Sequence, residues 1–308
     1  MKVSRGASGR SRWAQPSSSA GRDFGFWPKA FGYACCMSAS RGAPVDRGSP
    51  REPYEFTGDP TSPVLAIALH AGHDVRPEVD SRMRLDDAAR LREEDPFTDQ
   101  IAGAVASRIV VLRSRFEVDL NRPREEAVYR TPEACWGLEV WDDGLPTPLV
   151  DRSLAIHDDF YAALGRHLDH LATRGPFIVF DVHSYNHRRE SKGTPPSPQA
   201  GHPDLNVGTR WVKPQWRPVL DVVETAFREV EVAGHRLDVR ENVVFRGGYL
   251  PRWVAERYPD TGCAIALEFK KTFMDEWTGA VDGAHLQALA RGLQAAQASV
   301  LRTLARAA

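Results

Sequence analysis

Short apolar runs recur along the chain from residue 63 onward, and most of them end in polar or charged residues. Continuous runs of this length are typical of strands that are buried on both faces of a sheet. Four such runs lie at 64–69, 108–113, 176–182 and 263–269, and a weaker, alternating one lies at 235–242. Residues with helical apolar spacing occupy 98–107, 154–174, 217–231 and 282–307. The alternation predicts a three-layer α/β/α fold with a mostly parallel or mixed central sheet.

The first 58 residues show no such periodicity. They are rich in Ser, Gly, Arg and Pro, and segments of this composition bury too little apolar surface to offset the entropy lost on ordering. Residues 1–22 are rich in Arg and Ser and lack acids, as in transit peptides, but their glycines and Pro16 disfavour the required amphipathic helix. We predict a disordered leader over 1–58, which a misplaced start before Met37 would also explain, and a single domain over 59–308.

Composition and charge narrow the classes of function. Lys and Arg total 40 and Asp and Glu 41, a net charge of −1, so no basic field favours nucleic acid as a partner. No run approaches the roughly 18 apolar residues of a membrane-spanning helix. Two of the four cysteines are adjacent and two stand alone, which indicates neither a disulfide framework nor a paired-cysteine metal site. A cytoplasmic location is therefore expected.

Three of the apolar runs end in residues that can carry chemistry. His70 follows the first run, His183 follows the third, and Glu268 lies near the end of the fourth. Ligands of open α/β sheets bind in the crevice beyond the carboxyl ends of the strands. Neutral imidazoles with one carboxylate are a usual ligand set of catalytic zinc, and a further carboxylate can move protons for the bound water. The pattern predicts a zinc site at this edge of the sheet.

Simpler explanations exist for each residue taken alone. A histidine after a strand is usually only a hydrogen-bonding residue, whereas a carboxylate inside an apolar strand, as at Glu268, must be paired or functional. His73, His187 and His202 have no comparable placement. We interpret these three as structural residues or as supports for the site.

One stretch just after the second apolar run contains four polar residues: Arg115, Asp119, Asn121 and Arg122. A guanidinium binds a carboxylate through two parallel hydrogen bonds, which suits an acidic small molecule. Arg246 is a further candidate, because the neighbouring Gly247 and Gly248 allow the backbone to approach a ligand closely. The alternative for both stretches is an ordinary solvated turn.

In their order along the chain, these segments resemble the N-formylglutamate amidohydrolase family, which is distantly similar in fold to the zinc carboxypeptidases. The matching motifs are HAG (70–72), EEDPFTD (93–99), SRFEVDLNRP (114–123), DVHSYN (181–186), DLNVGT (204–209), FRGGY (245–249) and ALEFKKTFMDE (266–276). Each motif is weak alone, whereas all of them in register are specific. They span roughly residues 63–277.

The resemblance implies one zinc ion per chain, held by His70, His183 and a carboxylate. Asp95 matches the third ligand best, Glu94 is its rival, and His73 or Asp74 would be the next candidate.

The resemblance also implies roles for residues that do not touch the metal. Glu268 looks like the general acid/base, and Arg115 resembles the arginine that polarises the scissile carbonyl. Asn121 and Arg122 resemble the pair that holds the substrate carboxylate, and Arg246 would serve a second carboxylate.

The implied reaction is zinc-dependent hydrolysis of a small acidic N-acyl amino acid, with N-formyl-L-glutamate cleaved to formate and L-glutamate, a step of amino-acid catabolism. Leu69, where family members often have Pro, and the long basic loop 184–204 leave the substrate open. One alternative is a metallo-amidase or carboxypeptidase acting on another N-acyl or peptide substrate. The other is a non-catalytic protein that binds an acidic ligand. Neither the pattern nor the resemblance indicates an oligomeric state.

Overall fold

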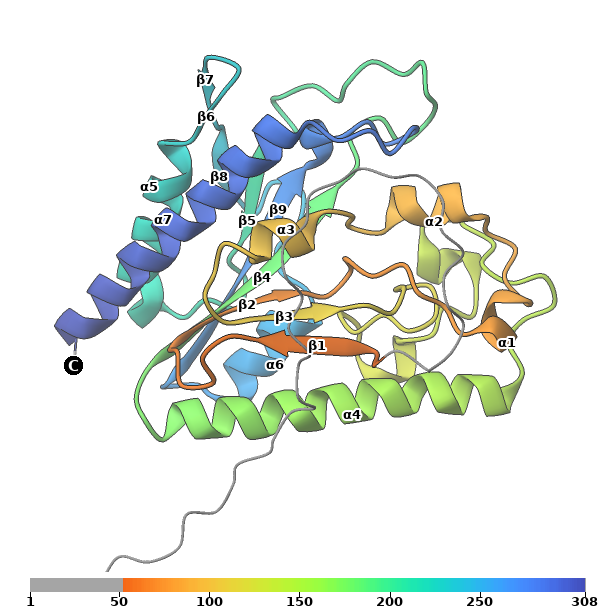
Figure 1. The fold of residues 1–308 in the computed structure, drawn as a ribbon, viewed down its shortest axis with the longest axis horizontal. Helices are drawn as coiled ribbons and strands as arrows, with labels where there is room; N and C mark the ends of the chain where they lie inside the picture. Colours follow the sequence, from red (N-terminus) through yellow and green to blue (C-terminus); the bar gives the residue numbers. More distant parts are fainter. Residues whose placement is uncertain (1–51, 308) are drawn as a thin grey trace, which may run out of the picture. The chain divides into compact units, whose positions relative to one another are not determined.

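A seven-stranded sheet forms the centre of residues 52–307, the part of the chain that the computed structural model describes (Figure 1). The strands are β1 (Tyr54–Thr57), β2 (Val64–Ala68), β3 (Arg108–Val111), β4 (Phe177–Tyr185), β5 (Leu205–Gly208), β8 (Val239–Glu241) and β9 (Gly262–Lys270). Their order is β1-β3-β2-β4-β9-β5-β8. The strands β3, β2, β4 and β9 are parallel, β1 is antiparallel to β3, and β5 is antiparallel to β9 and parallel to β8. The sheet is mixed, as predicted.

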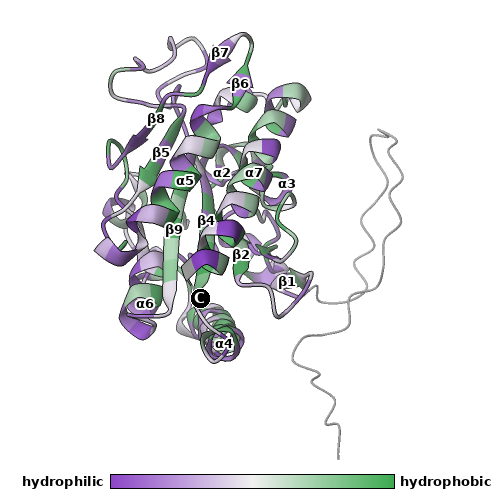
Figure 2. Ribbon diagram, turned by 90° about the vertical axis from the view of Figure 1, so that its left-hand side faces the viewer, coloured by the Kyte–Doolittle hydropathy of each residue, from purple (hydrophilic) through white to green (hydrophobic). Residues whose placement is uncertain are grey.

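Helices cover both faces of this sheet (Figures 1 and 2). The α-helices of the described residues are α1 (Pro77–Asp80), α2 (Asp87–Glu93), α3 (Thr98–Ala102), α4 (Thr147–Ala172), α5 (Arg217–Arg228), α6 (Tyr249–Arg257) and α7 (Gly283–Ala307), of which α1 and α2 lie to one side of the sheet. The main core lies between the sheet and α3, α5 and α7, and it receives Ile178, Phe180 and Val182 from alternate positions of β4. On the other face Tyr258, which follows α6, packs against the Phe177 ring and donates a hydrogen bond to the Gly165 carbonyl of α4. The three-layer prediction is confirmed.

The two central strands, β4 and β9, are buried along their whole length of nine residues each. Their register places His183 directly beside Glu268. Polar groups inside such strands lose their water and must find partners within the protein or take part in function. From the sequence we expected His183 just beyond its strand and Glu268 near the end of its strand. In the structure both strands continue for two residues after these positions.

Two strands of the central sheet were not predicted. The strand β1 lies within the segment assigned to the leader, so the described structure begins before the predicted boundary at residue 59. It is a four-residue edge strand with alternate residues exposed, which leaves a weak pattern in the sequence. The strand β5 is also short, and its buried Asn206 interrupts the apolar run. Residues 1–51 of the predicted leader lie outside the described residues.

The weak alternating run at 235–242 is divided in the structure. Its first residues form β7 (His235–Arg236), which pairs with β6 (Glu231–Val232) in a separate hairpin, and its last residues form β8. The predicted helix at 98–107 ends at Ala102, where Gly103 caps it, and α4 begins seven residues before the predicted start at 154. No helix among the described residues is long and apolar enough to cross a membrane.

Candidate active site

Three side chains from separate segments converge at the carboxyl ends of β2 and β4. His70 comes two residues after β2, Asp95 lies in the turn between α2 and α3, and His183 lies within β4. Asp95 Oδ2 is 3.3 Å from His70 Nδ1 and 3.0 Å from His183 Nδ1. Their ligand atoms all lie within 4.8 Å of one another, and all three residues are buried. Within residues 52–307, no other group of His, Cys, Asp or Glu has a comparable arrangement.

The Nε2 atom of each imidazole ring is hydrogen-bonded to a carboxylate. His70 Nε2 is hydrogen-bonded to Asp119 Oδ1 at 2.7 Å, and His183 Nε2 is hydrogen-bonded to Asp181 Oδ1 at 2.8 Å. Each ring therefore turns its Nδ1 toward Asp95. A carboxylate on the far nitrogen is the usual support of a metal-binding histidine, because it fixes the tautomer and the ring orientation.

The cluster fits a metal ion on chemical grounds. His70 Nδ1 is buried and has no hydrogen-bond partner, although it lies 3.3 Å from Asp95 Oδ2. A buried polar atom without a partner is costly, and a cation among the three donor atoms would remove that cost. Two imidazoles and one carboxylate leave a fourth position of tetrahedral zinc open. The residues present can thus hold a metal ion, and their types are those of a catalytic zinc site.

The rival acid and the third histidine make different contacts. Glu94 Oε2 lies 2.6 Å from His73 Nδ1, and Glu94 Oε1 accepts a hydrogen bond from Ser114. The Asp95 backbone N–H donates to the His70 carbonyl at 2.9 Å, which ties the Asp95 turn to the end of β2. The geometry groups Asp95, and neither Glu94 nor His73, with the two other predicted ligands.

Glu268 is the predicted acid/base, and its neighbours are charged. It lies beside His183 in the sheet register, and none of the described residues donates a hydrogen bond to its side chain. Burial raises the pKa of Glu268 to about 7, and Asp95 and Asp181 add to the increase while His183 and Arg115 oppose it. A carboxyl group with a pKa near neutrality can both accept and return a proton.

Arg115 and Asp119 form a buried network with a tyrosine. Arg115 Nη2 donates to Asp119 Oδ2 at 2.9 Å, and its Nε lies 3.3 Å from the Tyr129 hydroxyl, which in turn donates to Asp119. Burial works against the charge of Asp119, but Arg115 and His70 hold its pKa well below the usual value. Asp119 is therefore a carboxylate that joins Arg115 to the His70 ring.

The predicted substrate-binding residues lie around this network. Asn121 Nδ2 is 3.2 Å from His183 Nε2, and its Oδ1 accepts the Leu250 backbone N–H at 3.0 Å. Asn121 therefore joins the site to the first turn of α6. Arg122 donates to the Ala134 carbonyl at 3.1 Å and remains 30% exposed. Arg246 is exposed, and its guanidinium pairs with no acid of the described chain.

Two members of the site had no role in the sequence analysis. Asp181 was part of a quoted motif, and a carboxylate inside a buried strand two residues before His183 is a signal that could have identified it. Tyr129 lies in an irregular segment between β3 and α4, where no periodicity marks it. His187 and His202, predicted as structural or supporting residues, lie on the loop after β4, where they hydrogen-bond to Glu276 and to the Pro198 carbonyl and are not part of the three-residue cluster.

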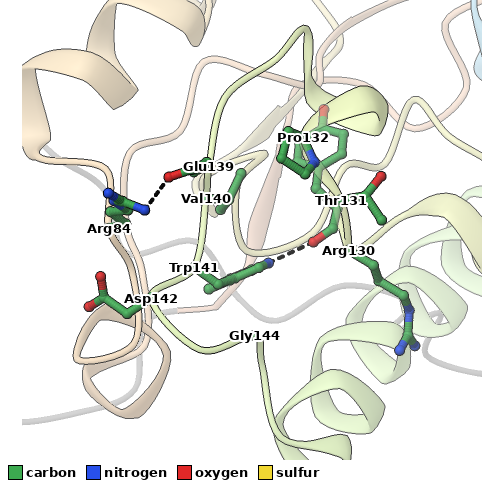
Figure 3. Close-up of a pocket in the computed structure, with 10 residues that line it drawn as sticks. Arg84, Arg130, Thr131, Pro132, Glu139, Val140, Trp141, Asp142 and Gly144 are labelled. Carbon is green, nitrogen blue, oxygen red and sulfur yellow. Dashed lines mark hydrogen bonds and ion pairs between the residues drawn. The ribbon is translucent and has the colours of Figure 1, made fainter.

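A separate pocket of about 240 Å³ lies next to this network (Figure 3). The Trp141 indole in its wall donates to the Tyr129 carbonyl, and Arg84 pairs with Glu139 at its rim. None of His70, Asp95, His183 or Glu268 lines the pocket. We therefore place the chemistry at the cluster and not in this pocket.

The fold and the cluster define an α/β protein that can hold a metal ion at the carboxyl ends of its central strands. The sequence profile of the N-formylglutamate amidohydrolase family matches residues 62–274, and the chain belongs to that family. It is accordingly an amidohydrolase, for which the family implies a small substrate.

Two solved structures share this fold. The N-formylglutamate amidohydrolase from Ralstonia eutropha JMP134 aligns with a TM-score of 0.66 and 18% identity, over 84% of this chain and 100% of that one. A gene product from Agrobacterium tumefaciens aligns with a TM-score of 0.59 and 15% identity, over 82% and 96% of the two chains. No curated protein matches the sequence significantly.

Proposed function

We propose that the protein is a zinc-dependent amidohydrolase that cleaves the amide bond of a small acidic N-acyl amino acid, with N-formyl-L-glutamate as the first candidate. The observation that carries the proposal is the convergence of His70 Nδ1, Asp95 Oδ2 and His183 Nδ1 within one buried cluster. The partnerless state of His70 Nδ1 and the carboxylate behind each ring support a metal at this point.

The chain supplies proton transfer and charge stabilisation. Zinc, when bound, supplies a Lewis acid that lowers the pKa of water and polarises a carbonyl. Glu268 takes a proton from the attacking water and returns it to the departing amine. Arg115 donates to the acyl oxygen as negative charge develops there, and its partner Asp119 keeps the guanidinium oriented. Family membership and the raised pKa of Glu268 support this division of roles.

Recognition of an acidic substrate needs free cations near these groups. Arg122 is partly exposed, and its acid partners are distant, with Glu126 Oε2 at 3.7 Å and Asp119 Oδ2 at 4.0 Å. A substrate carboxylate could replace the exposed Glu126 and bind Arg122 together with Asn121. Arg246 has no acid partner among the described residues and would bind a second carboxylate, as glutamate requires. A metallo-amidase or carboxypeptidase with another N-acyl or peptide substrate remains the alternative.

Two variants separate chemistry from binding. Glu268→Gln should keep zinc and substrate affinity but lose on the order of 10² to 10⁴ in kcat, the usual contribution of general acid/base catalysis. Arg122→Ala should mainly raise KM. Formate release from N-formyl-L-glutamate measures both, with N-acetyl, N-succinyl and dipeptide substrates tested in parallel for the alternative. Near wild-type turnover by Glu268→Gln would show that the mechanism is wrong.

The same residue sets the pH dependence. Glu268 acts as a base only when deprotonated, so its raised pKa of about 7 makes kcat/KM fall as the pH drops through that value. A bound zinc cation lowers this pKa, so the acidic limb of the zinc-loaded enzyme should lie at or below pH 7. The limb should disappear from the residual rate of Glu268→Gln, and its persistence would assign it to another group.

The third ligand can be tested by metal content alone. Asp95→Ala should lower the zinc bound per chain, because two remaining protein ligands hold zinc poorly. Glu94→Ala is the matched control, since Glu94 contacts His73 and Ser114. Equal zinc loss in both variants would contradict the assignment of Asp95.

A further inference from the structure

An exposed tryptophan lies between two arginines, one of which, Arg115, belongs to the network next to the His70, Asp95 and His183 cluster. Trp136 follows the short 3-10 helix Pro132–Cys135 and adopts a left-handed backbone conformation with φ 51°. Its ring centroid is 4.8 Å from Arg115 Cζ and 5.1 Å from Arg189 Cζ. Guanidinium groups over an indole ring are attracted to it, which fixes the position of the ring.

Glu93 completes the arrangement from a third segment. Its Oε2 accepts a hydrogen bond from Arg189 Nη2 at 2.7 Å, and its carbonyl lies 3.5 Å from Arg115 Nη1. Arg115, Trp136, Arg189 and Glu93 therefore form a closed chain of contacts. We name these four residues the Trp136 circuit.

The loop that carries Arg189 is itself anchored. The buried carboxylate of Glu276 accepts the backbone N–H groups of His187 and Arg188, and the Trp277 indole donates to the Arg188 carbonyl at 3.0 Å. The long basic loop after β4 is thus fixed where it meets the circuit.

The exposed fractions of Trp136 and Arg115 indicate from which side a ligand can approach the Arg115 guanidinium. Trp136 is 45% exposed, whereas the Arg115 side chain is only 11% exposed. The ring and the buried network thus cover most of Arg115. The remaining approach to the guanidinium is bordered by Trp136.

The geometry of an acyl group links Trp136 to the substrate. An N–H donor lies about 2.9 Å from the oxygen it binds, and the substituent of an acyl carbon lies about 2.4 Å from that oxygen. A substituent on an acyl group bound by Arg115 can therefore reach the indole when it is directed toward the ring, whose centroid is 4.8 Å from Arg115 Cζ.

We propose that Trp136, held by Arg189 and Glu93, is the wall of the acyl subsite and restricts the acyl group to formyl or one of similar size. The inference rests on the proposed role of Arg115 and deepens the proposed function, because it specifies the acyl half of the substrate. Trp136 is a specificity-determining residue in this account. Arg189 acts through it as a positioning residue.

The test is the ratio of kcat/KM for N-acetyl- and N-formyl-L-glutamate, extended to N-propionyl-L-glutamate. Wild-type protein should prefer the formyl compound, and Trp136→Ala should raise the acetyl-to-formyl ratio by about tenfold or more, since one methylene in a shaped pocket is worth roughly 10- to 200-fold. Trp136→Phe should restore most of the preference. Arg189→Ala should move the ratio in the same direction by a smaller factor, because the ring keeps its contact with Arg115.

Controls separate this inference from the proposed function. Trp253→Ala removes a tryptophan that also stacks on an arginine, but on α6, and it should leave the ratio unchanged. Zinc content should be equal in all variants. If wild-type protein releases formate but neither Trp136→Ala nor Arg189→Ala changes the ratio by more than about twofold, the inference is overturned and the proposed function stands. If wild-type protein cleaves none of the three compounds, N-formyl-L-glutamate is refuted as the substrate of the proposed function, and the inference fails with it.

Discussion

The two predicted zinc histidines rest on very different carboxylates. Asp119, behind His70, receives four hydrogen bonds, from the His70 ring, the Asn121 backbone N–H, Arg115 and Tyr129. Asp181, behind His183, is bonded to that ring alone, and its Oδ2 is buried without a partner. Both carboxylates are fully buried.

Carboxylates in equivalent positions, each bonded to a predicted zinc ligand, can therefore differ in how many other groups they hold. Asp119 joins His70, a predicted zinc ligand, to Arg115, which is proposed to bind substrate and has Asp119 as its charge partner. Asp181 orients one ring and nothing else among the described residues. Removing Asp119 should thus disturb several functions at once, whereas removing Asp181 should affect one.

The largest expected effect is that of Asp119→Ala. Zinc affinity should fall by about 100-fold, the upper end for loss of a residue that supports a ligand. The free energy of unfolding of the metal-free protein should also fall by roughly 3–5 kcal/mol, because Arg115 becomes a buried charge without its partner. Competition titration with a zinc chelator and urea unfolding measure the two quantities. Asp119→Asn, which keeps the shape, should unfold at a urea concentration between those of Asp119→Ala and wild type.

A smaller and more selective loss is expected for Asp181→Ala. Zinc affinity should fall by about tenfold, because the His183 ring loses its orienting partner. The free energy of unfolding should change by less than about 2 kcal/mol, since Asp181 pairs with no cation other than this ring and carries an unsatisfied oxygen. Equal destabilisation by Asp181→Ala and Asp119→Ala would remove the distinction between the two carboxylates.

The smallest effect belongs to Tyr129→Phe. It removes one of the four hydrogen bonds to Asp119 and leaves the ring in place, so the free energy of unfolding should fall by about 1 kcal/mol. Zinc affinity should change by less than about fivefold, because the His70–Asp119 bond remains. A loss as large as that of Asp119→Ala would mean that Tyr129, and not the carboxylate, organises the network.

The sequence predicted the parts of the site that lie on the central strands. The runs at β2, β4 and β9 are continuous and apolar, so the polar residues at their ends stand out, and the sheet brings His70, His183 and Glu268 to one edge. The resemblance added Asp95, which lies in a turn and has no pattern of its own.

The remainder depended on contacts that a linear pattern does not contain. Whether Asp119 or Asp181 supports a given ring follows from sheet register and loop path, and no spacing rule determines it. Tyr129 and Trp136 lie in the irregular segment between β3 and α4, where side chains are placed by tertiary packing. The edge strand β1 was missed for a related reason, since four residues give little periodicity.

The most direct test of the account is a zinc titration of metal-stripped protein, with formate release from N-formyl-L-glutamate as the readout. We predict that the rate is negligible without metal, rises linearly with added zinc and saturates at one zinc per chain, and that His183→Ala shows no such saturation. Full activity in the metal-stripped protein, or a rate that does not respond to zinc, would contradict the central claim.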